Sequence, residues 1–430
     1  MRETLLAFWE RLRANFWFVP SLMALATAGF SYGVTRIDAN RPVHDLMGWL
    51  WSGGADGARS LLSTIASSMI TVAGTVFSIT IAALTLAGSQ FGWRLLRNFT
   101  RDLGNQIVLG TFVSTFLYCL LILRTVRSED EGGFVPHVSV TCAVVFAVAS
   151  VGVLIYFIDH MARSIQAESL IAAIGADLRE TIRALRNSSD EEVLVGPPAV
   201  DGPMDSVLAE ESGYLEHLNH DRLVEFAERK SLLIESCLGP GDFVMRGSEL
   251  FKVHGAVSLN RHEQKELREA TKLDCRRTPT QDLRFGVRQL TEIAVRALSP
   301  GINDPYTAMT CADWLADCLG ELGCKQNVLL CRFGPSGEPR LLERTVSFEE
   351  VTNLSFDSFR IYGAESLIVM IHLLNLLTRL GLHVQEEYCR AVLRQHSKAA
   401  AEVALAACRG QWDRERLEAA ATRARSVLAE

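Results

Sequence analysis

Residues 60–93 read SLLSTIASSMITVAGTVFSITIAALTLAGSQFGW and contain no charged side chain. Their hydroxyl-bearing residues recur at alternating spacings of three and four, with Ala82 filling one gap in the series. The series consists of Thr64, Ser68, Thr71, Thr75, Ser78, Thr85 and Ser89. Because an α-helix has about 3.6 residues per turn, these side chains share one face of a predicted helix. The stretch is therefore predicted to span a membrane with a stripe of small polar side chains on one side, the hydroxyl stripe.

The hydroxyl stripe borders an apolar face of the same predicted helix. That face consists of Ile65, Met69, Val72, Val76, Ile79 and Leu86. In a bilayer, small polar residues either let neighbouring helices pack closely or line a water-filled path, and both interpretations stay open from the sequence. A helix over residues 61–93 would be about 50 Å long at about 1.5 Å per residue. It is expected to tilt, to break near Gly74 or Gly88, or to extend past the bilayer.

Three further stretches are long and apolar enough to cross a hydrocarbon core about 30 Å thick. They are residues 16–34, 103–123 and 132–158. The first is expected to stay in the protein, because Arg11 and Arg13 precede an apolar run that is too long for a signal peptide. The sequence therefore predicts four membrane-spanning helices.

Basic residues set the predicted orientation of the spans. Arg2, Arg11 and Arg13 precede the first span, Arg94, Arg97 and Arg101 lie between the second and third, and Arg163 follows the fourth. Such residues concentrate on the cytoplasmic side, and only Arg124 and Arg127, after the third span, conflict mildly with this arrangement. With four spans, we therefore expect both termini of the chain on the cytoplasmic side of the membrane.

The composition agrees with a membrane anchor joined to a water-exposed body. Charged residues make up 22% of the chain, the net charge is −7, and the charges are nearly absent from the predicted spans. This balance gives no support to a nucleic-acid partner. The ten cysteines include no C-x-x-C pair, so we expect reduced core residues and no disulfide framework.

The chain is predicted to be a membrane α-helical protein with a cytoplasmic α+β region. We expect a four-helix transmembrane domain over residues 1–160 and an amphipathic stalk helix over 161–186 that extends the fourth span. The acidic, proline-containing stretch 187–205 is typical of a linker. A small β-rich module is predicted over 206–260 and a mainly helical domain over 261–430.

Two turn signals place the expected strands. Pro240-Gly241-Asp242, followed by Gly247, is typical of a compact hairpin module and weakly resembles the turns of lipoyl-type domains, although no lysine stands where a carrier group would attach. A structural turn is the favoured interpretation. A second hairpin is predicted where residues 328–333 and 340–346 flank the turn at 334–337.

The densest polar cluster lies between residues 276 and 304. Arg284, Arg288, Glu292 and Arg296 repeat every fourth residue of one predicted helix. The simpler interpretation is a solvated salt-bridged face, followed by a helix that starts at Asn303, Asp304 and Pro305. The sharper hypothesis is a small-anion or metabolite site formed by Arg284, Arg288, Asn303 and Asp304, with arginines facing the amides at a helix N-terminus.

Two other polar positions stand next to apolar runs. Asp159 and His160 lie at the inner end of the fourth span, where ionisable groups gate ions or protons in some proteins and merely anchor the helix end in others. His372 lies in the apolar run 366–378, which is too short to span a membrane and is expected to form a buried helix or a subunit contact.

No enzyme motif is present in the sequence. It has no G-x-S-x-G, phosphate-binding P-loop, H-E-x-x-H or dinucleotide fingerprint. Isolated pairs such as His262 and Glu263 lack the helical spacing that two metal ligands on one face need. We therefore expect a protein without catalytic residues, metal or cofactor.

Two blocks of the sequence resemble a bacterial family of predicted membrane proteins, domain of unknown function 2254. They are the membrane block at residues 77–80, 90–91, 95–102 and 104–112, and the sequence ALSPGINDP at residues 297–305. The resemblance covers nearly the whole chain. It implies a bacterial inner-membrane location and lends no established activity.

Two functional hypotheses follow from these features. The first is an oligomeric channel or transport-like protein in which the second span lines a path for an ion and the cytoplasmic body gates or assembles it. The second is a membrane-tethered sensor or scaffold that binds an anionic ligand or a protein through Arg284, Arg288 and Asp304. In both, the lipid bilayer is a partner, and a homo-oligomer is expected.

Overall fold

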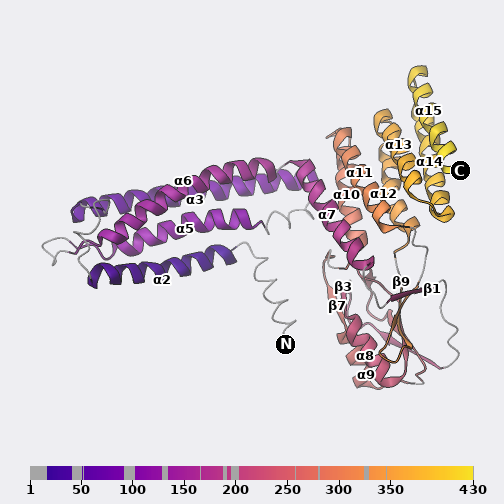
Figure 1. The fold of residues 1–430 in the computed structure, drawn as a ribbon, viewed down its shortest axis with the longest axis horizontal. Helices are drawn as coiled ribbons and strands as arrows, with labels where there is room; N and C mark the ends of the chain where they lie inside the picture. The colour runs from indigo at the N-terminus through magenta and orange to yellow at the C-terminus, as the bar shows by residue number, and fades with distance from the viewer. Residues whose placement is uncertain are drawn as a thin grey trace. The chain divides into compact units, whose positions relative to one another are not determined.

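The computed structural model describes residues 17–40, 51, 53–91, 102–127, 134–164, 166–186, 191–194, 203–256, 258–278, 281–323, 329–344 and 346–429. The chain divides into two compact units (Figure 1). We call Met1–Ser169 the N-terminal unit and Leu170–Glu430 the C-terminal unit. Each unit is described by itself.

Within its described residues, the N-terminal unit contains four helices that are long and apolar enough to cross a membrane. They are α2 (Phe18–Asn40), α3 (Ala55–Phe91), α5 (Leu103–Leu123) and α6 (His137–Ser164). Each coincides with one of the four stretches predicted from the sequence, although α2 continues past residue 34. Helix α3 is continuous through Gly74 and Gly88, so the break considered at these glycines does not occur.

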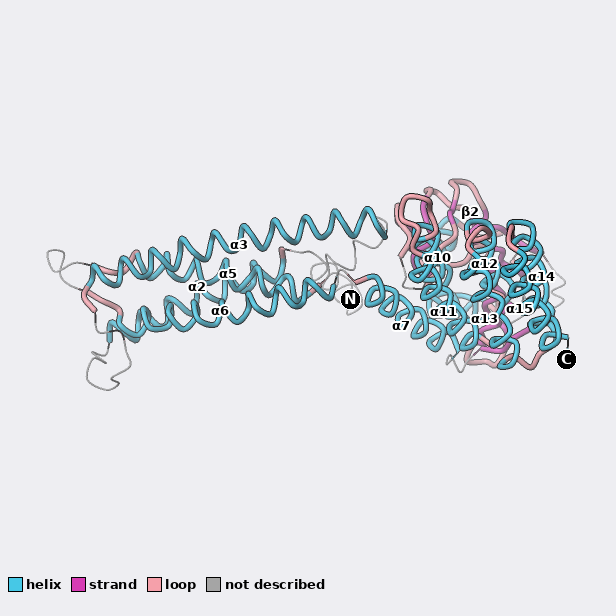
Figure 2. Tube along the Cα trace, turned by 90° about the horizontal axis from the view of Figure 1, so that it is seen from above, coloured by secondary structure: helices cyan, strands magenta, loops and turns pink. Residues whose placement is uncertain are grey.

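Helix α5 is the central helix of this bundle and packs against α2, α3 and α6. Figure 2 shows the four helices running side by side. Val108, Phe112, Cys119 and Ile122 of α5 are fully or almost fully buried. Their spacings of four, seven and three residues place them on one face of α5, which is the usual way for a helix to pack into a bundle.

The strands of the C-terminal unit form two sheets within the described residues. A six-stranded sheet has the order β1-β8-β9-β4-β6-β2, and a three-stranded sheet has the order β5-β3-β7. The strands are β1 (Glu191–Leu194), β2 (Met204–Leu208), β3 (Gly213–Leu218), β4 (Leu233–Ser236), β5 (Phe243–Val244), β6 (Glu249–His254), β7 (Thr271–Asp274), β8 (Leu329–Phe333) and β9 (Pro339–Arg344). The larger sheet therefore extends beyond the expected module at 206–260, because the predicted hairpin β8-β9 and a strand of the expected linker both join it.

Two short helices cover the core of these sheets. Helix α8 (His220–Lys230) is capped by Asn219, and α9 (Arg261–Glu269) begins with a capping box made by Asn260 and Glu263. Phe226 of α8 and Leu267 of α9 are buried in one cluster with Val207, Phe251 and Val253 of the strands. The turn at Gly241 has a positive φ of 88°, which glycine adopts without strain.

The remaining helices form the helical part of the C-terminal unit, and the first of them begins three residues before the boundary of that unit. They are α7 (Ala167–Arg186), α10 (Leu283–Ala297), α11 (Pro305–Leu322), α12 (Phe348–Tyr362), α13 (Leu367–His383), α14 (Glu387–Ala407) and α15 (Gln411–Ala429). The run containing His372 belongs to α13, where most of its leucines are buried.

Helix α7 differs from the expected stalk. It is separate from α6, which ends at Ser164, and its apolar face is buried in the C-terminal unit. Gly175 lies directly against the Trp314 ring of α11, and Leu178 lies against Gly286 of α10. The sequence predicts an amphipathic stalk that continues the fourth span, whereas α11 and α10 cover the apolar stripe of α7.

The cysteines were expected to be reduced, and all but one of those that the structure describes are free. Eight are free, and Cys389 is disulfide-bonded. Burial raises the pKa of the Cys318 thiol to about 12, so this thiol stays protonated and unreactive at neutral pH.

Candidate functional site

The hydroxyl stripe of α3 points away from the other helices of its own chain. Thr64, Ser68, Thr71, Thr75, Ser78 and Thr85 are all exposed. The side chain of Ser89 lies outside the described residues. The opposite face of α3 supplies the buried contacts, with Leu62, Ile65, Met69, Ala73 and Val76 in the core of the bundle. A single chain therefore does not enclose the stripe.

The hydroxyl groups of the stripe are hydrogen-bonded within α3 itself. Each of the following donates to the carbonyl oxygen four residues earlier, at 2.8–3.1 Å: Thr64, Thr71, Thr75, Ser78 and Thr85. A hydroxyl bonded in this way has no unsatisfied proton, and its oxygen still accepts a hydrogen bond. The stripe can therefore face lipid or a second helix at low cost, and it can also accept hydrogen bonds from water.

A second polar stripe, which was not predicted from the sequence, lies on α5 and is buried inside the bundle. Gln106, Gly110, Ser114 and Tyr118 repeat every fourth residue, and all four are buried. An added Cβ at Gly110 would fall 3.3 Å from Pro20 Cα, so glycine permits close packing against α2. The spacing was visible in the sequence, but the strongly apolar run around it concealed the pattern.

Buried hydroxyl contacts continue this second stripe between α5 and α6. Tyr118 donates to the carbonyl oxygen of Ser139 at 3.1 Å, and the hydroxyls of Thr115 and Ser150 lie 3.4 Å apart. Ser114 Oγ has no hydrogen-bond partner among the described residues. These contacts tie the bundle together through polar groups that lipid could not satisfy.

Asp38 near the end of α2 caps the start of α6. Its carboxylate accepts hydrogen bonds from the Val138 and Ser139 amides at 3.0 and 2.9 Å and from Ser139 Oγ at 2.6 Å. At the same end, His137 Nδ1 donates to the carbonyl oxygen of Trp51 at 2.6 Å. The first turn of a helix leaves backbone amides unpaired, and a carboxylate both satisfies them and suits the positive end of the helix dipole.

Replacing Asp38 with alanine is expected to lower the stability of the N-terminal unit by about 1–2 kcal/mol, because the amides of α6 lose their cap. In a thermal-unfolding measurement on the detergent-purified chain, this corresponds to a decrease of a few degrees in Tm. The matched control is Asp56→Ala, since Asp56 is an exposed carboxylate in the first turn of α3. Equal decreases for the two variants would contradict the capping role.

The two gating candidates take part in local ion pairs. His160 Nε2 lies 2.5 Å from Asp102 Oδ2, and the imidazole stacks on the Tyr156 ring. Asp102 also caps α5 by accepting from the Gly104 amide. Asp159 pairs with Arg163 one turn further along α6. The contact between His160 and Asp102 joins the end of α6 to the start of α5 and so anchors the two helices to each other. The gating role of Asp159 and His160 stays a prediction.

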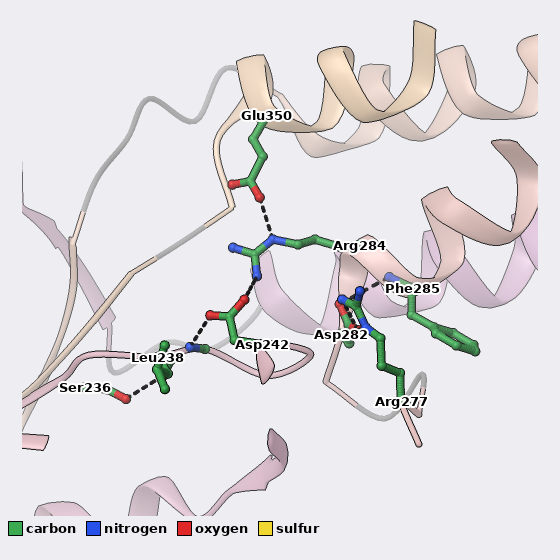
Figure 3. A network of polar contacts seen from close by, with 9 residues as sticks. Ser236, Leu238, Asp242, Arg277, Asp282, Arg284, Phe285 and Glu350 are labelled. Carbon is green, nitrogen blue, oxygen red and sulfur yellow. Dashed lines mark hydrogen bonds and ion pairs between the residues drawn. The ribbon is translucent and has the colours of Figure 1, made fainter. Parts of the chain in front are cut away.

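Arg284, the first anion-site candidate, lies between two carboxylates. Its Nε donates to Glu350 at 2.5 Å and its Nη1 donates to Asp242 at 3.0 Å, while Asp242 also accepts from the Gly239 amide at 2.8 Å (Figure 3). The carboxylates compensate the positive charge and occupy donors that an anion would need. Burial opposes the charged form of Arg284, but the bond to Glu350 and the nearby carboxylates outweigh it and raise its pKa.

A second buried pair lies beside this network. Arg277 donates to Asp282 through Nε at 2.9 Å, and Asp282, which caps α10, also accepts from the Phe285 amide at 3.1 Å (Figure 3). Only 2% of the Asp282 side chain is exposed. Burial raises the pKa of this carboxyl, and the Arg277 charge opposes that shift without cancelling it.

The other anion-site candidates are arranged differently. Asp304 caps α11, accepting from the Thr307 amide at 3.1 Å and from its hydroxyl at 2.6 Å. Asn303 is exposed and adopts a positive φ of 51°, and Arg288 is exposed on α10. The helix start predicted at Asn303-Asp304-Pro305 is confirmed. These contacts give Asp304 a capping role, and the anion site stays a prediction.

Comparison with known proteins places the chain among proteins of undefined activity. A family model described as predicted membrane protein, domain of unknown function 2254, matches residues 13–379. An uncharacterized protein of Mycobacterium tuberculosis strain CDC 1551 is 32% identical over 388 residues, which cover 88% of this chain and 74% of the relative. An uncharacterized protein of Mycobacterium bovis is 31% identical with the same coverage. No solved structure matches the chain.

Proposed function

The chain belongs to the predicted membrane protein family known as domain of unknown function 2254, and on that premise we propose that it forms a homo-oligomeric channel or transport-like protein. In this proposal, the hydroxyl stripes of neighbouring α3 helices meet around a common axis. They line a path for a small ion across the bacterial inner membrane. The C-terminal unit lies in the cytoplasm with both termini and gates or assembles the path.

The observation that carries the proposal is the exposure of the hydroxyl stripe. The four helices of one chain leave it uncovered, with Thr71, Thr75 and Ser78 all exposed. Gly74 lies next to them, and a Cβ added there would meet nothing within 4 Å. In lipid, helices associate through close packing of small residues, because the hydrophobic effect does not drive them together. This face of α3 is therefore suited to a second copy of the chain.

The chemistry of the stripe supports a path as well as a contact. The hydroxyl protons are used inside α3, so acceptor oxygens are what the stripe offers. Acceptor oxygens replace part of the hydration shell of a cation. Helix α3 has 37 residues, so at about 1.5 Å per residue it is longer than a hydrocarbon core about 30 Å thick.

The alternative role, a tethered sensor or scaffold that binds an anionic ligand or a protein, draws less support from the geometry. Arg284 is engaged by Asp242 and Glu350, so an anion would have to displace a carboxylate from it. Asp304 adds a further negative charge close to the α11 N-terminus. We therefore favour the channel over the sensor.

Replacing Thr71, Thr75 and Ser78 together with leucine is expected to reduce ion flux several-fold in proteoliposomes, because the bulky side chains prevent close packing of the stripes. The same variant is expected to shift the oligomer toward monomer in crosslinking from native-like membranes. A parent protein that carries no flux would refute the channel, whatever the variant does.

A near-isosteric variant separates packing from permeation. Thr71→Val, Thr75→Val and Ser78→Ala together remove the hydroxyls with little change in size. If the hydroxyl oxygens line the path, this variant keeps the oligomer and loses flux. An unchanged flux would show that the stripe only packs helices, which is the structural alternative to a channel.

A further inference from the structure

Exposed apolar side chains gather at one end of the helical part of the C-terminal unit. They come from the loop between α10 and α11, the start of α11, the end of α12 and the start of α13. They are Ile302 (46% exposed), Tyr306 (70%), Ile361 (58%), Tyr362 (57%) and Ile368 (39%). We call these five residues the apolar end. Exposed apolar groups that gather in this way indicate an interaction surface.

Contacts between α10 and α12 show why two of these segments lie at the same end. Arg284 pairs with Glu350 near the starts of the two helices, and Thr291 donates to the carbonyl oxygen of Leu354 at 3.2 Å further along. The helices therefore run in the same direction. Beyond their ends, a Cβ at Gly363 would lie 3.5 Å from Leu298.

Contacts between α11 and α13 place the other two segments there. His372 Nε2 lies 2.8 Å from Asp313 near the middle of α11, and Gly320 faces Leu380 towards the far ends. These helices also run in the same direction, so both start at the apolar end. Figure 1 shows the strands at the opposite ends of α10 to α13.

The chain enters the C-terminal unit at this same end. Arg179 of α7 pairs with Asp317 of α11 at 2.8 Å, and Arg183 pairs with Glu321 at 3.1 Å. Helices α7 and α11 are therefore parallel, so the part of α7 within the C-terminal unit begins at the end of that unit where α11 starts. Helix α7 starts at residue 167, only two residues after the end of α6 at residue 164.

We propose that the apolar end docks onto the lipid surface of the membrane that α6 crosses. The two residues that connect α6 to α7 span about 10 Å at most, so the start of α7 is held close to the membrane boundary. Tyrosine, with an apolar ring and a polar hydroxyl, is typical of the membrane interface, and isoleucine adds apolar area. The docking rests on the proposed membrane insertion of the spans.

Photo-crosslinking of the full chain in lipid nanodiscs tests this docking. A benzophenone amino acid replaces Tyr306 in one variant and Tyr362 in another, and lipid adducts are measured by mass spectrometry after illumination. The matched negative control is Leu382, which is 67% exposed at the opposite end of α13, and the positive control is Val148, which is 68% exposed in the middle of α6. We expect several-fold more lipid adduct at positions 306 and 362 than at 382.

The controls separate the docking from the membrane insertion on which it rests. Adducts at position 148 without an excess at 306 and 362 would overturn the docking and leave the insertion intact. Crosslinked dimers in place of lipid adducts at 306 would overturn it in favour of a contact between two copies. An absence of lipid adducts at 148 would overturn insertion and docking together.

Discussion

Replacing Arg277 with methionine is expected to destabilise the C-terminal unit by about 3–5 kcal/mol, because it leaves the carboxylate of Asp282 buried without its cation. Arg277 Nη2 lies 2.7 Å from Asp282 Oδ2, and their side chains are only 11% and 2% exposed. At about 2–4 °C per kcal/mol, the Tm of this unit should fall by about 10 °C in calorimetry of the detergent-purified chain.

The pH dependence of this loss identifies its cause. Burial raises the pKa of Asp282 in the folded protein, so the folded state binds the proton more tightly than the unfolded state. The contribution of Asp282 to the free energy of unfolding therefore falls as the pH rises from the ordinary pKa of an aspartate through the raised pKa in the folded protein. Without Arg277 the pKa rises further, so the deficit should be larger at pH 7 than at pH 4.5. The control is Arg276→Met, at an exposed neighbour, and a pH-independent deficit would contradict the charge explanation.

Replacing Gly175 with alanine is expected to destabilise the packing of α7 by about 1–3 kcal/mol, because the new methyl group would overlap the Trp314 ring. Trp314 also contacts Arg179, whose guanidinium lies 5.3 Å from the ring centroid, so the ring cannot shift without disturbing a second contact. Limited proteolysis should then cleave the α7 segment faster than in the parent protein, and the Tm should fall by several degrees.

Gly320→Ala is the matched control, on the helix that α7 contacts. A Cβ at Gly320 would meet Leu380 at an ordinary distance of 3.8 Å, so there is room for it. Alanine also favours a helix over glycine by about 1 kcal/mol, so this variant should be as stable as the parent or more stable. If Gly175→Ala were equally neutral, the close packing of α7 on α11 would be refuted.

The helices of the membrane part were predictable because their signal is long and simple. Charged residues such as Arg59, Asp102 and Arg124 bound the apolar stretches, and length alone separates a span from a buried helix. The ends were less predictable: α2 continues to Asn40 through Arg36 and Asp38, which a rule based on apolar runs excludes. Those two side chains bond to Tyr32 and to the start of α6, contacts that a single segment does not reveal.

The face that each span buries was not predictable. Apolar residues flank the hydroxyl stripe of α3 on both sides, so its pattern does not say which side meets α5. The buried stripe of α5 contains Gln106 and Tyr118. From the sequence, these two polar residues lie in an apolar run, and nothing indicates which side of the helix is buried. Their burial follows from the position of α5 between α2, α3 and α6, which is a property of the assembled bundle.

The polar cluster of the C-terminal unit shows a similar limit. The sequence predicted the helix cap at Asp304 and the charged residues at every fourth position of α10, because both are local patterns. It did not reveal that Asp242 and Glu350 meet Arg284 from 42 and 66 residues away. Such distant pairs decide whether an arginine is available to a ligand.

The hydrogen bonds inside α3 have a consequence for how the protein is made. Because Thr71, Thr75 and Ser78 donate to their own helix, these three hydroxyls present no unsatisfied donor when a newly synthesised α3 leaves the insertion machinery sideways into lipid. Each copy can then complete its own bundle before it meets another. In the proposed homo-oligomer, assembly would therefore follow insertion as a separate, concentration-dependent step, and subunits of different age could exchange.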